Sequence, residues 1–325
     1  MMGKKISYEA NLNELKMLIK SVDDQQRVRI SVGNRIVANI NAKLGQNPNE
    51  KLSDKESNQL INKLKRDYIR ISDAYADARK NELLGIIQNN KKNSGIISTI
   101  FEYKLAEHYM KFLETEKDMV KTVSKTVLDF PIYTDYLANV KGIGPLSAGI
   151  LIATLDPYRA RHCSSFQACA GIDVVHIEDD KGNVVGIGRN NHKECLVTRK
   201  YLDKHGKEQE KLSITYNPFL KSKLLGVIVP NLIKAKNELY YPTYLDYKAR
   251  QIEKYSTITG MKDGKPVREY QGGMTLRHID NRAKRYAAKW FLNDLWNFWR
   301  KQENLPVTQP YEIAKLGHKE HGFNY

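Results

Sequence analysis

The segment that most constrains the fold is residues 137–154, where two apolar runs flank the sequence Lys-Gly-Ile-Gly-Pro at residues 141–145. A proline has a preset φ and no amide proton, so Pro145 suits the first turn of a helix. Gly142 and Gly144 allow positive φ and leave no Cβ to block a close approach. The pattern predicts a tight corner between two short helices, as in a helix-hairpin-helix. The alternative is an ordinary turn between two packed helices.

The same corner predicts an anion site at the start of its second helix. The first amides of a helix have no partner within it, and the helix dipole adds partial positive charge there. On a nucleic acid the anion is a phosphate. The ammonium of Lys141 would lie beside these amides. The candidate DNA-binding residues at the corner are Lys141, Gly142, Ile143, Gly144, Leu146 and Ser147.

Charge points to the same class of partner. The 325 residues include 53 Lys and Arg against 37 Asp and Glu, a formal net charge of +16. Such an excess favours polyanions. No stretch approaches 18 uncharged apolar residues, which argues against a membrane span, and the N-terminus lacks the apolar core of a signal peptide. We expect a cytoplasmic protein that binds DNA, with structured RNA left open and no membrane partner.

Helical periodicity dominates the chain, so we expect a mainly α fold with small β-hairpin insertions. Residues 1–130 read as a helical, coiled-coil-like region, for which a homodimer through these helices is left open. Residues 131–240 would form a helix-hairpin-helix DNA-binding domain with β-hairpin arms. Residues 241–325 would form a C-terminal helical region and a tail.

Caps, breaks and periodicity place the individual elements. Ser53 and Glu56 form a capping box at the start of one helix. Strand-like alternation on either side of turn residues predicts two hairpins, over 173–188 and 196–216. Residues 260–273 read as a loop. The expected helices cover residues 8–44, 54–88, 96–128, 218–239 with an interruption at Pro230, and 275–302.

The last helix has two faces. Its apolar face carries Ala283, Ala287, Trp290, Phe291, Leu295 and Trp299. A second face carries His278, Arg282, Arg285 and Lys289, and of these Arg282, Arg285 and Lys289 are candidate DNA-binding residues. The alternative is a solvated face without a partner. Other basic residues that could extend a phosphate track are Arg159, Arg161, Arg189, Lys193, Arg199, Lys200, Lys221 and Lys223.

Signals for catalysis are weak, and the catalytic residues are unknown. We find no set of acidic residues spaced as two-metal nucleases require, and no nucleophile in an activating motif. Cys163, Cys169 and Cys195 lack the paired spacing of a zinc site, so we expect no metal site and reduced thiols. We predict no cofactor, with Mg²⁺ entering only if the chain is catalytic.

Three segments resemble a known family. Residues 140–148 read V-K-G-I-G-P-L-S-A, residues 164–172 read S-S-F-Q-A-C-A-G-I, and residues 217–224 read N-P-F-L-K-S-K-L. They are similar to the C-terminal helix-hairpin-helix domain of insertion-sequence transposases of the IS-one-ten type (the IS-one-sixteen and IS-nine-oh-two group). The resemblance implies DNA binding in transposition or recombination.

The chain also departs from that family. The family has an N-terminal RuvC-like domain with a DEDD carboxylate set, and residues 1–130 show neither its strands nor its carboxylates. The serine that the family places after the second segment is missing from residues 173–182. No catalytic residue can therefore be transferred. Three hypotheses remain: sequence-nonspecific DNA binding through the helix-hairpin-helix, an active strand-transfer recombinase with an unrecognised or intersubunit site, and a helical structural or interaction protein.

Overall fold

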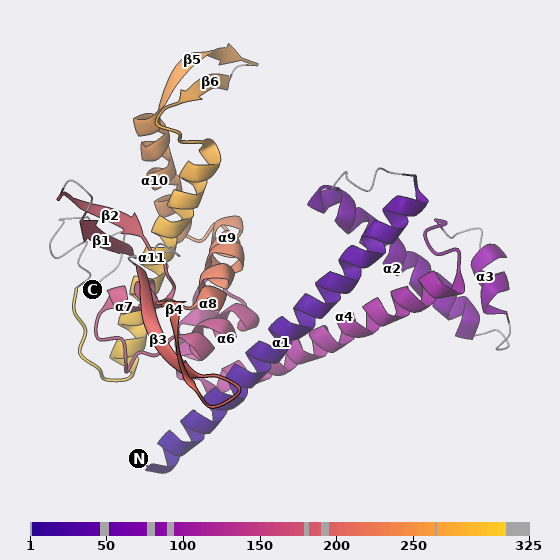
Figure 1. Ribbon diagram of the computed structural model, residues 1–325, viewed down its shortest axis with the longest axis horizontal. Helices are drawn as coiled ribbons and strands as arrows, with labels where there is room; N and C mark the ends of the chain where they lie inside the picture. The colour runs from indigo at the N-terminus through magenta and orange to yellow at the C-terminus, as the bar shows by residue number, and fades with distance from the viewer. Residues whose placement is uncertain are drawn as a thin grey trace. The chain divides into compact units, whose positions relative to one another are not determined.

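Helices make up most of the chain, as predicted, and three small antiparallel hairpins complete it (Figure 1). This computed structural model describes residues 2–45, 52–76, 82–89, 94–178, 182–189, 195–263 and 265–309. The chain divides into two compact units. One consists of Met17–Val123, and the other of Met1–Lys16 together with Ser124–Tyr325. The described residues contain no helix that is both long enough and apolar enough to cross a membrane.

The unit Met17–Val123 is built from parts of two long helices, α1 (Met2–Lys43) and α4 (Ile100–Thr126), and from α2 (Asp54–Ala76) and α3 (Leu83–Asn89). Ser53 and Glu56 form the predicted capping box, because the Ser53 amide donates to the Glu56 carboxylate at 2.9 Å and the Glu56 amide donates to Ser53 Oγ at 3.3 Å. The single helix predicted over 54–88 is wrong. Glu82 is not helical, and α3 packs against α2 as a separate helix.

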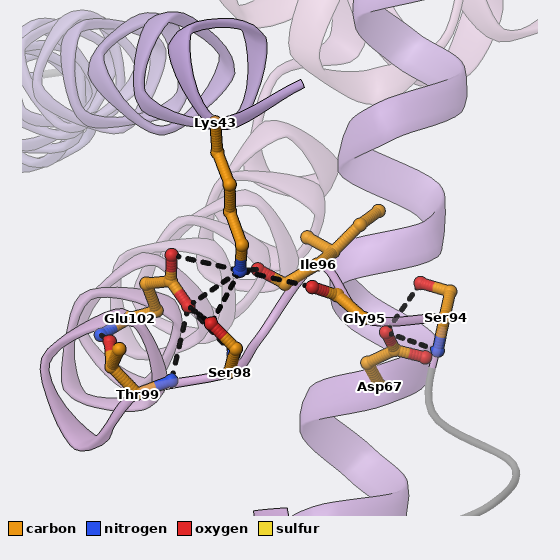
Figure 2. A network of polar contacts seen from close by, with 8 residues as sticks. All are labelled: Lys43, Asp67, Ser94, Gly95, Ile96, Ser98, Thr99 and Glu102. Carbon is orange, nitrogen blue, oxygen red and sulfur yellow. Dashed lines mark hydrogen bonds and ion pairs between the residues drawn. The ribbon is translucent and has the colours of Figure 1, made fainter. Parts of the chain in front are cut away.

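Polar contacts fix the segment that leads into α4 (Figure 2). Lys43 Nζ, at the end of α1, donates to the Gly95 carbonyl at 3.0 Å and forms an ion pair with Glu102 at 3.1 Å. The buried carboxylate of Asp67 on α2 accepts from the backbone amide of Ser94 at 3.0 Å. Two buried or partly buried charges thus satisfy the backbone of one irregular segment. Removing one partner of such a contact would leave a polar group without a hydrogen bond, which lowers the stability of the fold.

The other unit is organised around α11 (Leu276–Gln302), and Thr275 caps this helix by accepting from the His278 amide at 3.2 Å. Its predicted apolar face is confirmed, because Ala283, Ala287, Phe291 and Leu295 are fully buried and all three tryptophans are at most 2 % exposed. The helices and helical turns around it are α5 (Pro131–Asp135), α6 (Pro145–Thr154), α7 (Cys163–Cys169), α8 (Pro218–Lys223), α9 (Val229–Lys234), α10 (Tyr240–Tyr255), η1 (Val127–Asp129), η2 (Leu137–Asn139) and η4 (Leu224–Ile228).

Proline explains where the helical path between α8 and α9 changes. η4 is a π-helical turn that ends directly before α9, and Pro230 stands in the first turn of α9. Because proline has no amide to donate, the regular hydrogen-bond ladder cannot continue through it. The predicted interruption near Pro230 is confirmed, and it takes the form of a widened turn rather than a break.

Three two-stranded ribbons leave the helical body of this unit. The first two were predicted: β1 (Val174–Glu178) pairs with β2 (Val184–Gly188), and β3 (Leu196–Leu202) pairs with β4 (Glu208–Ile214). The third corrects the loop predicted for 260–273, because β5 (Ser256–Lys262) pairs with β6 (Lys265–Tyr270). In the predicted C-terminal tail, residues 310–325 lie outside the described residues.

Candidate nucleic-acid interface

The predicted corner is present, and α6 begins where the proline predicted it. The Ile143 amide donates to the Val140 carbonyl at 2.9 Å and closes the turn. Pro145 occupies the first turn of α6, whose first backbone bond runs from the Ala148 amide to the Gly144 carbonyl at 3.0 Å. The element before the corner is shorter than a regular helix, because only α5 and the single turn η2 precede it.

Gly142 anchors the corner against α9. Its φ is +101°, as predicted for a glycine-dependent turn. A Cβ at this position would lie 2.9 Å from both the carbonyl oxygen of Asn231 and the Cα of Leu232. Both contacts are with backbone, which cannot move aside cheaply. Glycine is therefore required at position 142 for two reasons: the positive φ, and the lack of space for a Cβ against α9.

Gly144 plays a different part and does not use the positive φ that a glycine allows. Its φ of −94° and ψ of 171° are ordinary extended values, because it is the N-cap residue of α6 and caps lie in the β region. Gly144 is exposed, and a Cβ built on it would have no other heavy atom within 4 Å. The space that a Cβ of Gly144, the N-cap of α6, would enter is therefore open.

The side chains of the corner divide into buried and exposed sets. Ile143 and Ser147 are 8 % and 7 % exposed, and Leu146 is half-buried. The Ile143 amide is used within the turn, so of the two buried residues only Ser147 offers its amide to a ligand. Lys141 is exposed. The corner thus presents one ammonium and a short row of amides, of which those of Leu146 and Ser147 precede the first helical bond.

Asn237 holds the corner from the other side, and sequence reasoning missed it. Its side chain is 5 % exposed and donates from Nδ2 to the Lys141 carbonyl at 2.9 Å. Its Oδ1 accepts from the amides of Leu239 and Tyr240 at 3.0 and 3.2 Å, at the start of α10. An asparagine shortly before a helix is a capping signal. The contact with residue 141, distant in sequence, has no such signal.

Charges of both signs surround the corner. Lys234 lies at the end of α9, which packs on Gly142, and Lys236 follows it; both are exposed. Asp135 and Glu238 are exposed acids in the same neighbourhood, and Asp135 accepts a hydrogen bond from Gln302 at 2.7 Å. The local field therefore comes from three lysines against two carboxylates, one of which is already hydrogen bonded.

A cavity of about 290 Å³ adjoins the corner. Tyr136 and Tyr240 place their hydroxyl oxygens 3.3 Å apart, and Tyr240 donates to the buried carboxylate of Asp294 at 2.8 Å. Burial raises the pKa of both tyrosines well above the usual range, so both hydroxyls stay protonated at neutral pH. The lining residues are Asp135, Tyr136, Asn139, Val140, Lys141, Asn237, Glu238, Leu239 and Tyr240.

The basic face predicted on α11 extends away from the corner. His278, Arg282 and Arg285 are exposed and Lys289 is half-buried. The Arg282 guanidinium lies 5.6 Å from the ring centre of Tyr255, the last residue of α10, whereas the corner adjoins the first residues of α10. With 16 residues, α10 spans about 24 Å. The structure therefore separates Arg282 from the corner along α10, whereas Lys289 lies two residues before Phe291, whose ring contacts Tyr240 at the start of α10.

Several of the other predicted phosphate contacts are used internally. Arg189 forms a paired contact with Asp173, at 2.8 and 2.9 Å, at the base of the β1–β2 ribbon. Lys221 donates to the Arg189 carbonyl at 2.8 Å and lies 4.3 Å from the ring centre of Tyr216. Burial, and after it the positive charge of Arg285, lower the pKa of Lys221. Arg189 and Lys221 therefore support the fold. Lys193 lies outside the described residues.

The potential metal ligands and the thiols of the described residues are not gathered into a site. No three His, Cys, Asp or Glu side chains in that part of the chain are grouped closely enough to hold a metal ion. Cys163 and Cys195 are buried, Cys169 is half-buried, and none of the three is in a disulfide. Burial raises the pKa of Cys169, which makes it a poorer nucleophile.

No protein-family model, curated protein or solved structure matches the chain. Two of the sequence segments singled out above have regular local structure. Phe166 lies in α7, which Gly171 follows with a φ of +63°, and Asn217 caps α8 by accepting from the Leu220 amide at 3.1 Å. Function must therefore be argued from the corner and its surroundings.

Proposed function

We propose that the chain binds the phosphate backbone of duplex or branched DNA, without reading base sequence, through the corner at residues 141–147, and serves in transposition or recombination. The observation that carries the proposal is the open space at the Cβ position of Gly144, the N-cap of α6. Gly142 and Asn237 fix the corner behind that space. A helix start that is both rigid and open can meet a phosphate without rearrangement.

The chemistry of the corner fits a phosphate group. The amides of Leu146 and Ser147 would donate to its oxygens, and the ammonium of Lys141 would neutralise its charge. Contacts of this kind set the position of a protein on DNA and carry no sequence information. The formal charge of +16 supplies the long-range attraction that brings the DNA to the surface.

The test is the salt dependence of DNA affinity, measured with the full chain and a mixed-sequence duplex. For wild type, log K should fall linearly with log salt between about 50 and 200 mM. Lys141→Ala should reduce the magnitude of that slope by about 0.9, the contribution of one phosphate contact. Lys121→Ala is the matched control, because Lys121 is an exposed lysine that pairs with Asp118 within α4.

Two results would contradict the proposal. One is an affinity that does not change with salt, because phosphate contacts release counterions. The other is a Lys141→Ala slope equal to that of wild type. The transposition or recombination role has a separate readout, which is the frequency of transposition in cells that carry wild type or Lys141→Ala. An equal frequency for the two would contradict that part of the proposal.

A further inference from the structure

The β5–β6 ribbon has little support from the helices of its unit. It leaves the ends of α10 and α11 and projects past them, as Figure 1 shows. Beyond Ser256, every residue of β5 is exposed, on both faces of the strand. A two-stranded ribbon without a packed face is marginally stable in water. Its conformation is thus suited to stabilisation by a partner.

Near its outer end the ribbon carries an apolar cross-strand pair, one step inside the terminal pair of Lys262 and Lys265. Met261 and Pro266 are cross-strand partners, Met261 is 68 % exposed, and Pro266 is also exposed. Ile258, nearer the base, is 58 % exposed. Between Ile258 and Gly260 the register shifts by one residue, and such a bulge re-aims the strand beyond it. The ribbon therefore carries apolar side chains outward without any core to receive them.

Cations accompany these apolar residues. Lys262 is exposed next to Met261. At the base of the ribbon, the Lys254 ammonium and the Arg282 guanidinium lie 5.4 and 5.6 Å from the ring centre of Tyr255. The exposed cations of α10 and α11 near this end are Arg250, Lys254, Arg277, Arg282 and Arg285, and the exposed acids are Glu253 of α10 with Asp263 and Glu269 of the ribbon. Positive charge thus predominates where the ribbon joins the helices.

We infer that the β5–β6 ribbon enters the minor groove of duplex DNA and wedges Met261 and Pro266 between base pairs, which kinks the duplex. The inference rests on the proposed function, because the corner would supply the backbone grip. Apolar wedges of this kind, Met and Pro among them, unstack a base step and bend DNA toward the major groove. The cations at the ribbon base would then contact the phosphates that flank the groove.

The geometry favours a wedge over base reading. The ribbon's one arginine, Arg268, donates to Ser256 Oγ at 3.2 Å and so braces the ribbon base. At the proposed wedge, Met261 and Pro266 offer a thioether and a pyrrolidine ring, which have no strong donor for a base edge. The donor beside them is the ammonium of Lys262. Sequence-independent binding with bending is the outcome that such side chains can give.

The experiment measures DNA bending by energy transfer between dyes on the two ends of a duplex of about three helical turns, with the full chain at saturating concentration. Wild type should shorten the end-to-end distance in line with a kink of roughly 20–90°. The double variant Met261→Ser with Pro266→Ser should still bind through the corner and should leave the duplex straight. Val184→Ser is the matched control, because Val184 is 72 % exposed on a different ribbon; it should bend DNA like wild type.

The outcomes separate the two proposals. If wild type binds DNA without bending it, or if the double variant bends DNA like wild type, the ribbon inference is wrong and the proposed function stands. If wild type does not bind duplex DNA at low salt, the proposed function itself fails. Binding and distortion of an RNA duplex alone would overturn the assignment of the ribbon to DNA. Circular dichroism of each variant checks that it is folded.

Discussion

Replacing Gly142 with alanine is the substitution whose effect the structure specifies most fully. The new methyl group would lie 2.9 Å from two backbone atoms of α9, and the residue would have to hold a φ of +101°. A left-handed backbone costs a non-glycine residue about 1–2 kcal/mol. Overpacking against a rigid neighbour adds about 1–3 kcal/mol. We therefore expect Gly142→Ala to lower the free energy of unfolding of this unit by about 2–5 kcal/mol.

The assay can be restricted to the unit that contains the corner. All three tryptophans of the chain lie in α11, so tryptophan fluorescence during urea unfolding reports this unit alone. Gly144→Ala is the matched control, since its φ is ordinary and its Cβ would be in open space. It should cost only about 0.5–1 kcal/mol, through the weaker cap. Equal unfolding midpoints for the two variants would refute the packing of Gly142 on α9.

Two further predictions concern pH. Burial opposes the ionisation of Glu102, but hydrogen bonds from Ser98 and Lys43 outweigh it and lower the pKa of this carboxyl below its ordinary 4.5. The stabilising effect of the ionised carboxylate is present above pH 4.5 and is lost as the pH falls. Glu102→Gln should therefore lower the stability of the protein at pH 7 and match wild type in acid, as measured by far-ultraviolet circular dichroism during unfolding. A stability difference that stays constant with pH would contradict this. Burial, followed by the charges of Glu303 and Asp156, raises the pKa of Tyr8 to about 12. The stability that depends on the neutral Tyr8 hydroxyl is lost as the pH rises from 10 through about 12. Tyr8→Phe should therefore lose less stability over this pH range, as followed by tryptophan fluorescence during unfolding. Identical pH profiles of stability for the variant and wild type would contradict this.

Local signals made much of the fold predictable. Gly142 and Pro145 act through their own backbone preferences, so the corner and the start of α6 could be placed without knowledge of the rest. The apolar repeat of α11 from Ala283 to Trp299 has the 3.6-residue period that identifies a buried helix face. Ser53 with Glu56 identified a helix start by reciprocal hydrogen bonds that span three residues.

Features that depend on distant contacts were missed. The hydrogen bond between Asn237 and the Lys141 carbonyl joins residues 96 positions apart, and neither residue signals the other. Gly144 resembles Gly142 in sequence, but only Gly142 meets a second backbone, and that neighbour decides the difference. The β5–β6 ribbon had a local signal, because Asp263-Gly264 is a hairpin turn sequence, but glycines on both sides made the segment look like a loop.

The measurement that tests the phosphate-binding corner most directly compares Gly144→Asp with Gly144→Ala. An aspartate at an N-cap accepts hydrogen bonds from the amides two and three residues later, here Leu146 and Ser147, so it would occupy the amides proposed for phosphate. Gly144→Asp should leave the stability of the unit unchanged or raise it by a few tenths of a kcal/mol, and should weaken DNA binding strongly, while Gly144→Ala binds like wild type. If Gly144→Asp is folded and binds DNA as tightly as wild type, the corner does not bind phosphate.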